Sequence, residues 1–320
     1  MKIAVVGAGF TGSLVADFLK DAGHQVTVFE KSRGRGGRLT HKRTDWGNFD
    51  IGACEIRATD PRFCQFLQRL MPQQLVARWQ AKGFIYDGQL VPESAEPCRF
   101  VFTPGMNSLC RHYLKRVELC LSVRIKHMQR TQSGWMLWDE QEGKYGGFDW
   151  VVLTAPWPQT QPILAEHLGG PAVDELDWLP CWSVAVQPQR RLNTEADIIY
   201  PKQGPVQLML NDSAKPRRDR EESVWVIQLT HEASAQLHRS DQDEVLSTAV
   251  NELQQVTGEA VNVVHHYKHF WRYARLSHEA EGPGMIFKPE QSVAALGDWS
   301  AGGSTQAAFR AVEQFKRFWS

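Results

Sequence analysis

The feature that most limits the fold is a glycine-rich turn between two short apolar runs at the start of the chain. Residues 2–6 are mostly apolar, residues 7–12 read GAGFTG, and residues 13–22 carry apolar side chains at helical spacing. Gly23 marks the end of this helix, and residues 25–30 form a second run rich in Val and Phe. This order predicts a right-handed β-α-β unit with parallel strands.

The glycines of this turn have the spacing of a pyrophosphate-binding turn. In the pattern G-x-G-x-x-G, Gly7 permits the tight turn, Gly9 lets the backbone approach the pyrophosphate, and Gly12 lets the helix pack close to the strand. The helix N-terminus, at Phe10 and Thr11, supplies N–H donors and partial positive charge. We therefore predict that these five residues bind a dinucleotide.

An acidic residue, Glu30, ends the second apolar run. Its carboxylate is placed to accept hydrogen bonds from the ribose hydroxyls of an adenosine. The same carboxylate would repel a 2′-phosphate. The dinucleotide is therefore predicted to be FAD or NAD rather than NADP.

A basic, glycine-rich loop helps to decide between FAD and NAD, because NAD dehydrogenases seldom have such a loop at this place. The loop begins with Lys31 and Arg33. Gly36 and Gly37 let the backbone pass near the pyrophosphate, and Arg38 offers a forked guanidinium to its oxygens or to the flavin. The loop favours FAD.

A second indication of FAD lies near the other end of the chain. Residues 292–296, a mostly apolar predicted strand, lead into Gly297 and Asp298, and such an Asp can bond a ribityl hydroxyl. A predicted helix over 305–319 follows, and its N-terminus, at Thr305 and Gln306, can stabilise negative charge on a reduced flavin. We therefore predict that the dinucleotide is FAD.

The rest of the chain predicts an α/β protein, α+β when taken as a whole, with two lobes. A chain of 320 residues is long enough for both. We assign residues 1–72, 98–162 and 284–320 to a discontinuous first lobe, and residues 73–97 and 163–283 to a smaller second lobe with an antiparallel sheet.

Several elements are predicted at particular places. Helices are expected over about 61–70 and 241–257, and strands over 182–187, 207–211 and 224–229. The mixed-sign run over 215–222, KPRRDREE, is expected to be a solvated loop.

Charge and cysteine content set limits on partners and compartment. Lys plus Arg and Asp plus Glu number 36 each, so no general field favours nucleic acid or an anionic membrane. No apolar run is long enough for a signal peptide or a membrane span. Six scattered cysteines without C-x-x-C spacing predict reduced thiols in the cytoplasm. The histidine spacing predicts no metal site.

The combined motifs resemble flavin-containing amine oxidases, and especially the renalase-like branch. The similarity rests on the glycine turn, the acidic strand end, the KSRGRGGR loop and the late Gly-Asp. It continues, in the right order over nearly the whole chain, through residues 50–53 (DIGA), 60–63 (DPRF), 211–218 (NDSAKPRR), 225–234 and 269–274 (HFWRYA).

The resemblance implies that the first lobe is a Rossmann-like FAD-binding domain with non-covalent FAD. It implies that the second lobe is a substrate domain that interrupts the first, as in the amine oxidase and p-hydroxybenzoate hydroxylase-like group. It adds Gly52, Ala53 and Val123 to the implied cofactor contacts. For renalase-like enzymes it implies oxidation of the 2- or 6-dihydro isomers of NAD(P)H, with hydride transfer to flavin N5 and reoxidation by oxygen.

The chain departs from the family where a flavin-side wall is expected. The usual Gly-Ala-Gln-Tyr-Phe-Thr is replaced by residues 52–57, GACEIR. In an extended segment Glu55 and Arg57 point to one side, and Cys54 and Ile56 to the other. Two alternatives remain open: the charged pair faces the cavity and favours a zwitterionic or polar substrate, or it is an ordinary surface pair.

No catalytic residue is certain, and the cavity candidates are Glu55, Arg57, Trp271 and Tyr273. Trp271 and Tyr273 share one face of a predicted strand, and Trp299 follows the Gly-Asp turn. These rings form either an aromatic wall for a flat ligand or part of the core.

The leading interpretation is therefore an FAD-dependent oxidase acting on a small molecule. One alternative is an oxidase of an amine or another small polar compound. The other is a catalytically silent FAD-binding sensor or scaffold, which the altered residues 54–57 suggest.

Overall fold

The computed structural model describes residues 1–94, 98–168, 177–218, 223–239, 242–277 and 284–319. The chain divides into two compact units, each built from separate segments. The first unit contains residues 1–38, 107–178 and 275–320, and the second contains residues 39–106 and 179–274.

These units differ in extent from the predicted domains. Residues 39–72 and 98–106 group with the second unit, although the sequence placed them in the first lobe. The reason lies in their pairing: residues 56–57, 76–78 and 99–102 form one small sheet among themselves. The assignment of cofactor and substrate to separate domains stays a prediction.

The first unit is built on a mostly parallel sheet of six strands. Their order is β10 (Glu118–Leu121), β2 (Gln25–Glu30), β1 (Lys2–Val6), β14 (Trp150–Leu153), β21 (Val293–Ala295) and β20 (Ile286–Lys288). The first five run parallel, and β20 pairs antiparallel at the edge. The predicted β-α-β unit is confirmed.

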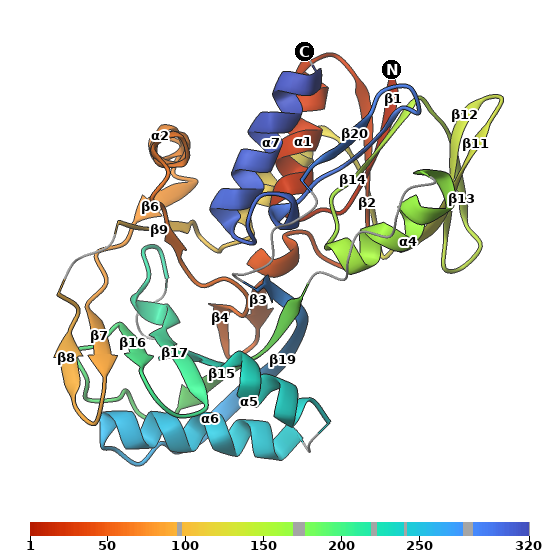
Figure 1. The fold of residues 1–320 in the computed structure, drawn as a ribbon. Coiled ribbons are helices and arrows are strands. Elements are labelled where there is room, and N and C mark those ends of the chain that lie inside the picture. Colours follow the sequence, from red (N-terminus) through yellow and green to blue (C-terminus); the bar gives the residue numbers. More distant parts are fainter. Residues whose placement is uncertain (95–97, 169–176, 219–222, 240–241, 278–283, 320) are drawn as a thin grey trace. The chain divides into compact units, whose positions relative to one another are not determined.

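Helices pack on this unit because their apolar stripes face inward. α1 (Phe10–Asp21) contacts α3 (Ser108–Tyr113) and α7 (Thr305–Trp319), and the rings of Phe18 and Phe315 meet edge to face at 6.3 Å. Figure 1 shows α1 and α7 running alongside each other. The predicted bounds of α7 are confirmed.

A second layer consists of a three-stranded antiparallel sheet and a helix, α4 (Trp157–Leu168). The strands are β11 (Ile125–Thr131), β12 (Gly134–Asp139) and β13 (Lys144–Phe148). Their apolar side chains share a core with β1 and β14. Trp299 belongs to this core: it is fully buried, and its Nε1 donates to the Ala155 carbonyl at 3.0 Å. The core alternative therefore holds for Trp299.

The second unit is built on a seven-stranded sheet. Its order is β19 (Val263–Leu276), β15 (Trp178–Pro188), β18 (Trp225–Leu229), β17 (Val206–Asn211), β16 (Ile198–Pro201), β7 (Gly83–Tyr86) and β8 (Leu90–Pro92). An apolar core joins the sheet to α5 (His231–Gln236) and α6 (Gln242–Thr257). The predicted strands and helix of this region are confirmed.

Smaller elements complete the second unit. They are the hairpin β3 (His41–Thr44) with β4 (Gly47–Asp50), the sheet of β5 (Ile56–Arg57), β9 (Arg99–Phe102) and β6 (Val76–Arg78), and α2 (Pro61–Leu70). α2 begins where the sequence predicts, because the Asp60 side chain caps it by accepting from Arg62 N and Phe63 N.

The run that begins at Lys215 is not the solvated loop that the sequence predicted. Lys215 is buried, and its Nζ lies 2.8 Å from Asp50 Oδ2 and 2.5 Å from Asp212 Oδ1. Arg218 pairs with the same two carboxylates. Two buried carboxylates thus bind two buried cations. We call Asp50, Asp212, Lys215 and Arg218 the buried ion cluster; residues 219–222 of the predicted loop lie outside the described residues.

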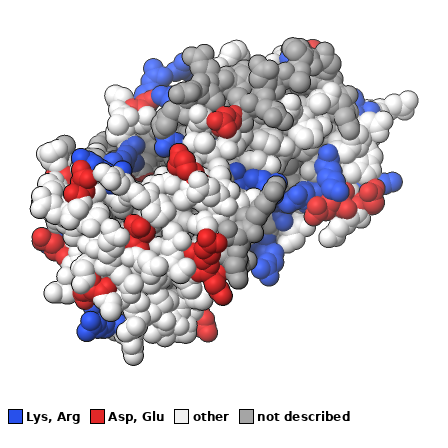
Figure 2. Space-filling view, turned by 60° about the horizontal axis from the view of Figure 1, so that its bottom comes forward, with Lys and Arg blue, Asp and Glu red and all other residues white. Residues whose placement is uncertain are grey.

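The surface carries charges of both signs. Figure 2 shows Lys and Arg interspersed with Asp and Glu on the face it presents. The six cysteines are free thiols. Within the described ranges, no helix is long and apolar enough to cross a membrane.

Candidate functional site

The predicted cofactor residues of the first unit lie at one edge of its parallel sheet. Gly7 follows β1, Glu30 ends β2, Val123 comes two residues after β10, and Asp298 comes three residues after β21. Carboxyl ends of parallel strands share an edge, where α/β proteins bind their ligands. Two strands separate β2 from β21, so the edge between them spans about 14 Å. That span suits an extended ligand.

The glycine-rich turn has three different constraints. Gly7 has a positive φ of 114°, which favours glycine. A Cβ on Gly12 would lie 1.9 Å from the Gly7 carbonyl oxygen, so α1 can approach β1 only without a side chain there. A Cβ on Gly9 would meet nothing within 4 Å. Open space therefore faces Gly9, as the approach of a ligand to the backbone requires.

Thr154 supports this turn, and sequence reasoning missed it. Its hydroxyl donates to the Val6 carbonyl at 3.0 Å and lies 3.2 Å from the Gly7 carbonyl. Thr154 directly follows β14, so it reaches the turn from the neighbouring strand. A threonine after an apolar strand is too common to have signalled this role.

The N-terminus of α1 has no negative group of its own. Its N-cap, Gly9, makes no side-chain cap bond, and its first turn contains no acidic residue. The partial positive charge of the helix end is thus uncompensated by the helix itself. An anionic pyrophosphate fits the N-terminus of α1.

Glu30 ties two loops of the site together. Its side chain is buried, and its two carboxylate oxygens accept from Ala8 N at 2.9 Å and from Ser32 N at 2.8 Å. Its backbone carbonyl accepts from Val123 N at 2.9 Å. Each carboxylate oxygen has a second lone pair, so both remain able to accept from ribose hydroxyls.

The basic loop approaches the glycine turn through its glycines. Gly36 N donates to the Ala8 carbonyl at 2.8 Å, and a Cβ on Gly37 would lie 3.4 Å from Gly9 Cα. Lys31 and Arg33 are exposed at the start of the loop. Lys31 Nζ donates to Gln159 Oε1 at 3.0 Å.

Arg38 and Asp298 bind each other. Two parallel hydrogen bonds join them, from Arg38 Nη1 to Asp298 Oδ2 at 2.8 Å and from Nη2 to Oδ1 at 2.5 Å. The Asp298 side chain is 8% exposed and that of Arg38 is 30% exposed. The sequence placed both residues at the cofactor but did not predict their pairing. Asp298 opens η5 (Asp298–Ser300), and Thr305 and Gln306 open α7 shortly afterwards.

The Arg38–Asp298 pair should be energetically coupled. We expect Arg38→Gln to lower the free energy of unfolding by about 1 kcal/mol or more, because it leaves the nearly buried Asp298 unpaired. Asp298→Asn should cost less, and the double variant should cost little more than Arg38→Gln. Urea unfolding of the four proteins measures this coupling. Arg116→Gln, which removes an exposed ion pair, is the control; purely additive losses would contradict the prediction.

In the second unit, two side chains hold the segment that contains Gly52 and Ala53. Trp271 Nε1 donates to the Ile51 carbonyl at 2.9 Å, and Gln228 Nε2 donates to the Gly52 carbonyl at 2.7 Å. Trp271 and Tyr273 are half-buried, with exposed Arg272 between them, so they share one face of β19. Their contact with a substrate stays a prediction.

The segment after Ala53 alternates as predicted. Cys54 and Ile56 are buried, whereas Glu55 is 12% exposed and Arg57 is 41% exposed at the side chain. Glu55 nevertheless has partners besides Arg57. Neither the cavity-facing pair nor the surface pair predicted from the sequence included them.

Glu55 is the centre of a hydrogen-bonded network. It accepts from Arg57 Nε at 2.9 Å, from Tyr200 OH at 2.8 Å and from Arg99 Nε at 2.9 Å. Arg99 also pairs with Glu93. Burial, and then Glu55, raise the pKa of Tyr200. Glu55 therefore offers no uncompensated charge to a substrate. No sequence spacing could have linked it to Arg99 or Tyr200.

Comparison with known proteins agrees with this geometry. Residues 5–70 match the family model of the NAD(P)-binding Rossmann-like domain. A stretch of 60 residues is 43% identical to the 4,4′-diapophytoene desaturases (4,4′-diaponeurosporene-forming) of Staphylococcus aureus strains MRSA252 and Newman. That stretch is 19% of this chain and 12% of each desaturase.

Three solved structures are similar over nearly the whole chain. A putative protoporphyrinogen oxidase from Exiguobacterium sp. 255-15 has a TM-score of 0.77 at 12% identity, covering 98% of this chain and 97% of its own. An oxidoreductase from Methanosarcina mazei has a TM-score of 0.78 at 11% identity, covering 99% and 100%. The PF1083 protein from Pyrococcus furiosus has a TM-score of 0.68 at 14% identity, covering 99% and 98%.

The predicted fold class is confirmed, since a mixed α/β chain with a Rossmann-like part shares its fold with these structures. By their names, the curated relatives are desaturases, one of the structures is a putative protoporphyrinogen oxidase and another is an oxidoreductase. Residues 5–70 thus resemble the NAD(P)-binding Rossmann-like domain, and the fold of nearly the whole chain is similar to that of these solved structures.

Proposed function

We propose that this protein is an FAD-dependent oxidoreductase that holds its flavin non-covalently in the first unit. The observation that carries the proposal is the Arg38–Asp298 pair. It joins the basic loop beside the glycine turn, at one end of the sheet edge, to the turn near the C-terminus. An extended FAD needs both places: the first for its adenosine diphosphate and the second for its ribityl chain and flavin.

Individual residues of the first unit suit the separate parts of FAD. The open space at Gly9 and the uncapped N-terminus of α1 suit the pyrophosphate. Glu30 suits the adenosine ribose, and Asp298 suits a ribityl hydroxyl. The N-terminus of α7, at Thr305, suits the negative charge of a reduced flavin.

The bound flavin would supply the hydride acceptor, at N5. The chain's own residues would bind and orient the substrate and exclude water. The substrate class we propose is a 2- or 6-dihydro isomer of NAD(P)H, with oxygen as the final acceptor. It follows from the resemblance to renalase-like proteins, and its oxidation needs no strong base on the protein, because it restores an aromatic ring.

A zwitterionic amine is less well supported. That alternative has the charged pair Glu55 and Arg57 facing the substrate, and Glu55 already accepts from three donors of the chain itself. Anaerobic reduction of the bound flavin distinguishes an enzyme from a catalytically silent sensor.

The test uses the purified full chain incubated with FAD and then desalted. We expect flavin absorbance bands, and their rapid anaerobic loss on addition of the 6-dihydro isomer of NADH but not of an amine panel. Readmitted oxygen should restore the bands and give hydrogen peroxide. A protein that stays colourless refutes the cofactor. A yellow protein that neither the isomer nor the amines reduce refutes the enzymatic proposal and favours the sensor.

A further inference from the structure

The second unit contains a polar pocket of about 590 Å³ that the proposed flavin chemistry does not use. Its lining comes from three stretches: Arg78–Lys82, Arg191–Asp197, and the residues from Asn211 to Pro216 together with Ser223. The volume is within the range of small-molecule sites.

The sheet register explains why these three stretches meet. β7 and β16 are parallel, with Gly83 opposite Ile198, so the residues preceding both strands lie at the same edge. β17 runs antiparallel to β16, with Leu210 opposite Ile198, which brings Asn211 to that edge too. Asn211 N donates to the Asp197 carbonyl at 2.8 Å, and Asp197 N donates to the Lys82 carbonyl at 2.9 Å. The pocket is therefore built on regular sheet structure.

Two buried polar atoms of this pocket lack a partner among the described residues. They are Asn211 Oδ1 and Ser223 Oγ. Asn211 is only 9% exposed, and burying an amide oxygen without a hydrogen bond is unfavourable. Such a group is expected to have a ligand or water as its partner.

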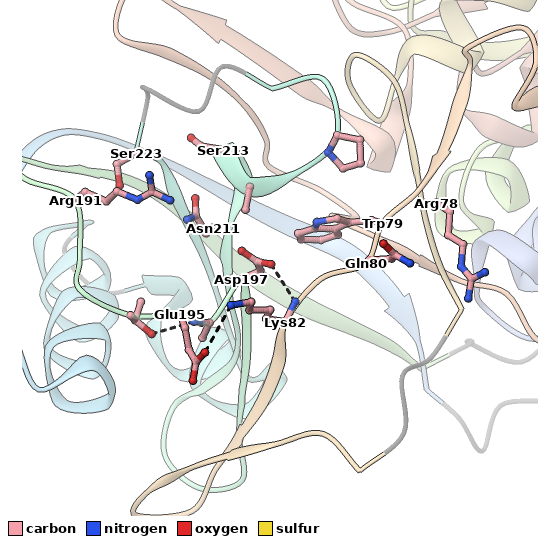
Figure 3. Close-up of a pocket in the computed structure, with 14 residues that line it drawn as sticks. Arg78, Trp79, Gln80, Lys82, Arg191, Glu195, Asp197, Asn211, Ser213 and Ser223 are labelled. Carbon is pink, nitrogen blue, oxygen red and sulfur yellow. Dashed lines mark hydrogen bonds and ion pairs between the residues drawn. The ribbon is translucent and has the colours of Figure 1, made fainter.

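The charge of the pocket rests on two arginines. Lys82 Nζ lies 3.6 Å from Glu195 Oε2, and Asp197 Oδ2 accepts from Lys82 N at 2.9 Å. For Arg78 and Arg191, the described part of the chain provides no ion-pair or hydrogen-bond partner to the guanidinium groups. Figure 3 shows Arg191 on the same side of the view as Asn211 and Ser223, with Arg78 on the opposite side.

We propose that this pocket binds a small molecule that carries both a phosphate or carboxylate group and a hydroxyl. The Arg191 guanidinium and the Ser223 hydroxyl hold the oxyanion, and the hydroxyl of the ligand donates to Asn211 Oδ1. A guanidinium offers a fork of donors to an oxyanion, and the Ser223 hydroxyl offers its O–H. The Asn211 amide oxygen is an acceptor, so it requires a donor on the ligand. Arg78 adds positive charge at the other end of the pocket. The site is separate from the residues proposed to hold FAD.

The test is calorimetric titration of the full chain with inorganic phosphate and, separately, with citrate, at constant ionic strength. We expect saturable binding of at least one probe. Phosphate alone identifies a phosphate ligand, citrate alone a carboxylate ligand, and both a general oxyanion site. Arg191→Gln and Ser223→Ala should each weaken binding, the first about tenfold or more, without changing the flavin content.

Arg190→Gln is the matched control, because Arg190 is an exposed neighbour outside the pocket lining. Equal weakening by Arg190→Gln and Arg191→Gln would mean a nonspecific surface effect and would overturn the proposal. No saturable binding of either probe would overturn it as well.

Discussion

Replacing Lys215 with methionine should lower the free energy of unfolding by about 3–5 kcal/mol, among the largest effects of any single substitution in this chain. Lys215 is 1% exposed and binds Asp50 and Asp212, both fully buried. Methionine keeps most of the volume but leaves two carboxylates with Arg218 as their only cation in the cluster. An uncompensated buried charge costs more than the pair contributes.

The matched control is Lys202→Met. Lys202 also makes an ion pair, with Asp87 at 3.4 Å, but its side chain is 59% exposed. Its loss should change the free energy of unfolding by less than about 1 kcal/mol. Urea unfolding at neutral pH measures both variants. Similar losses for the two lysines would show that burial does not govern the effect, contrary to our expectation.

The pH dependence adds an independent check. Burial by itself raises the pKa of Asp50, but Lys215 and Arg218 outweigh it and hold that pKa well below its usual range. A carboxyl group with a depressed pKa stabilises the fold above its unfolded pKa of about 4, and this contribution disappears as the pH falls further. Without Lys215 the pKa of Asp50 should rise. The difference in the free energy of unfolding between wild type and Lys215→Met should therefore become smaller as the pH is lowered.

Local patterns predicted much of the fold because their causes lie within a few residues of each other. The turn from Gly7 to Gly12, the Asp60 cap and the helix from Thr305 to Trp319 are all of this kind. Each is determined by backbone conformation, capping or helical spacing, which a sequence shows directly.

Long-range pairings could not be predicted in the same way. Lys215 lies 165 residues from Asp50, and Arg38 lies 260 residues from Asp298. A run such as KPRRDREE has the composition of a solvated loop, and its composition contains no sign of Asp50, the distant carboxylate that pairs with the buried Lys215. Glu55 is similar, since Tyr200 reaches it from 145 residues away. The candidate site was therefore predicted as a set of residues, but not as a set of contacts.

Effects on cofactor binding can be separated from effects on folding by replacing glycine with alanine at three positions, one in each variant. Gly12→Ala should destabilise the first unit by about 1–3 kcal/mol, because its Cβ would meet a backbone oxygen at 1.9 Å that no side-chain movement can relieve. It should also abolish flavin retention. Without this clash, alanine within a helix would stabilise the protein by up to about 1 kcal/mol, so the sign of the effect is decisive.

Gly9→Ala should behave differently. Gly9 has a φ of −79° and a ψ of −169°, which alanine adopts freely, and its Cβ would enter open space. The cofactor-free protein should therefore keep its stability, whereas flavin retention should fall sharply because the methyl group occupies the place proposed for the pyrophosphate. Gly34→Ala, in the basic loop, meets nothing within 4 Å and should change neither property. Thermal unfolding of the cofactor-free chains and flavin absorbance after desalting measure the two effects. If Gly9→Ala retained flavin as wild type does, the pyrophosphate could not lie against this turn.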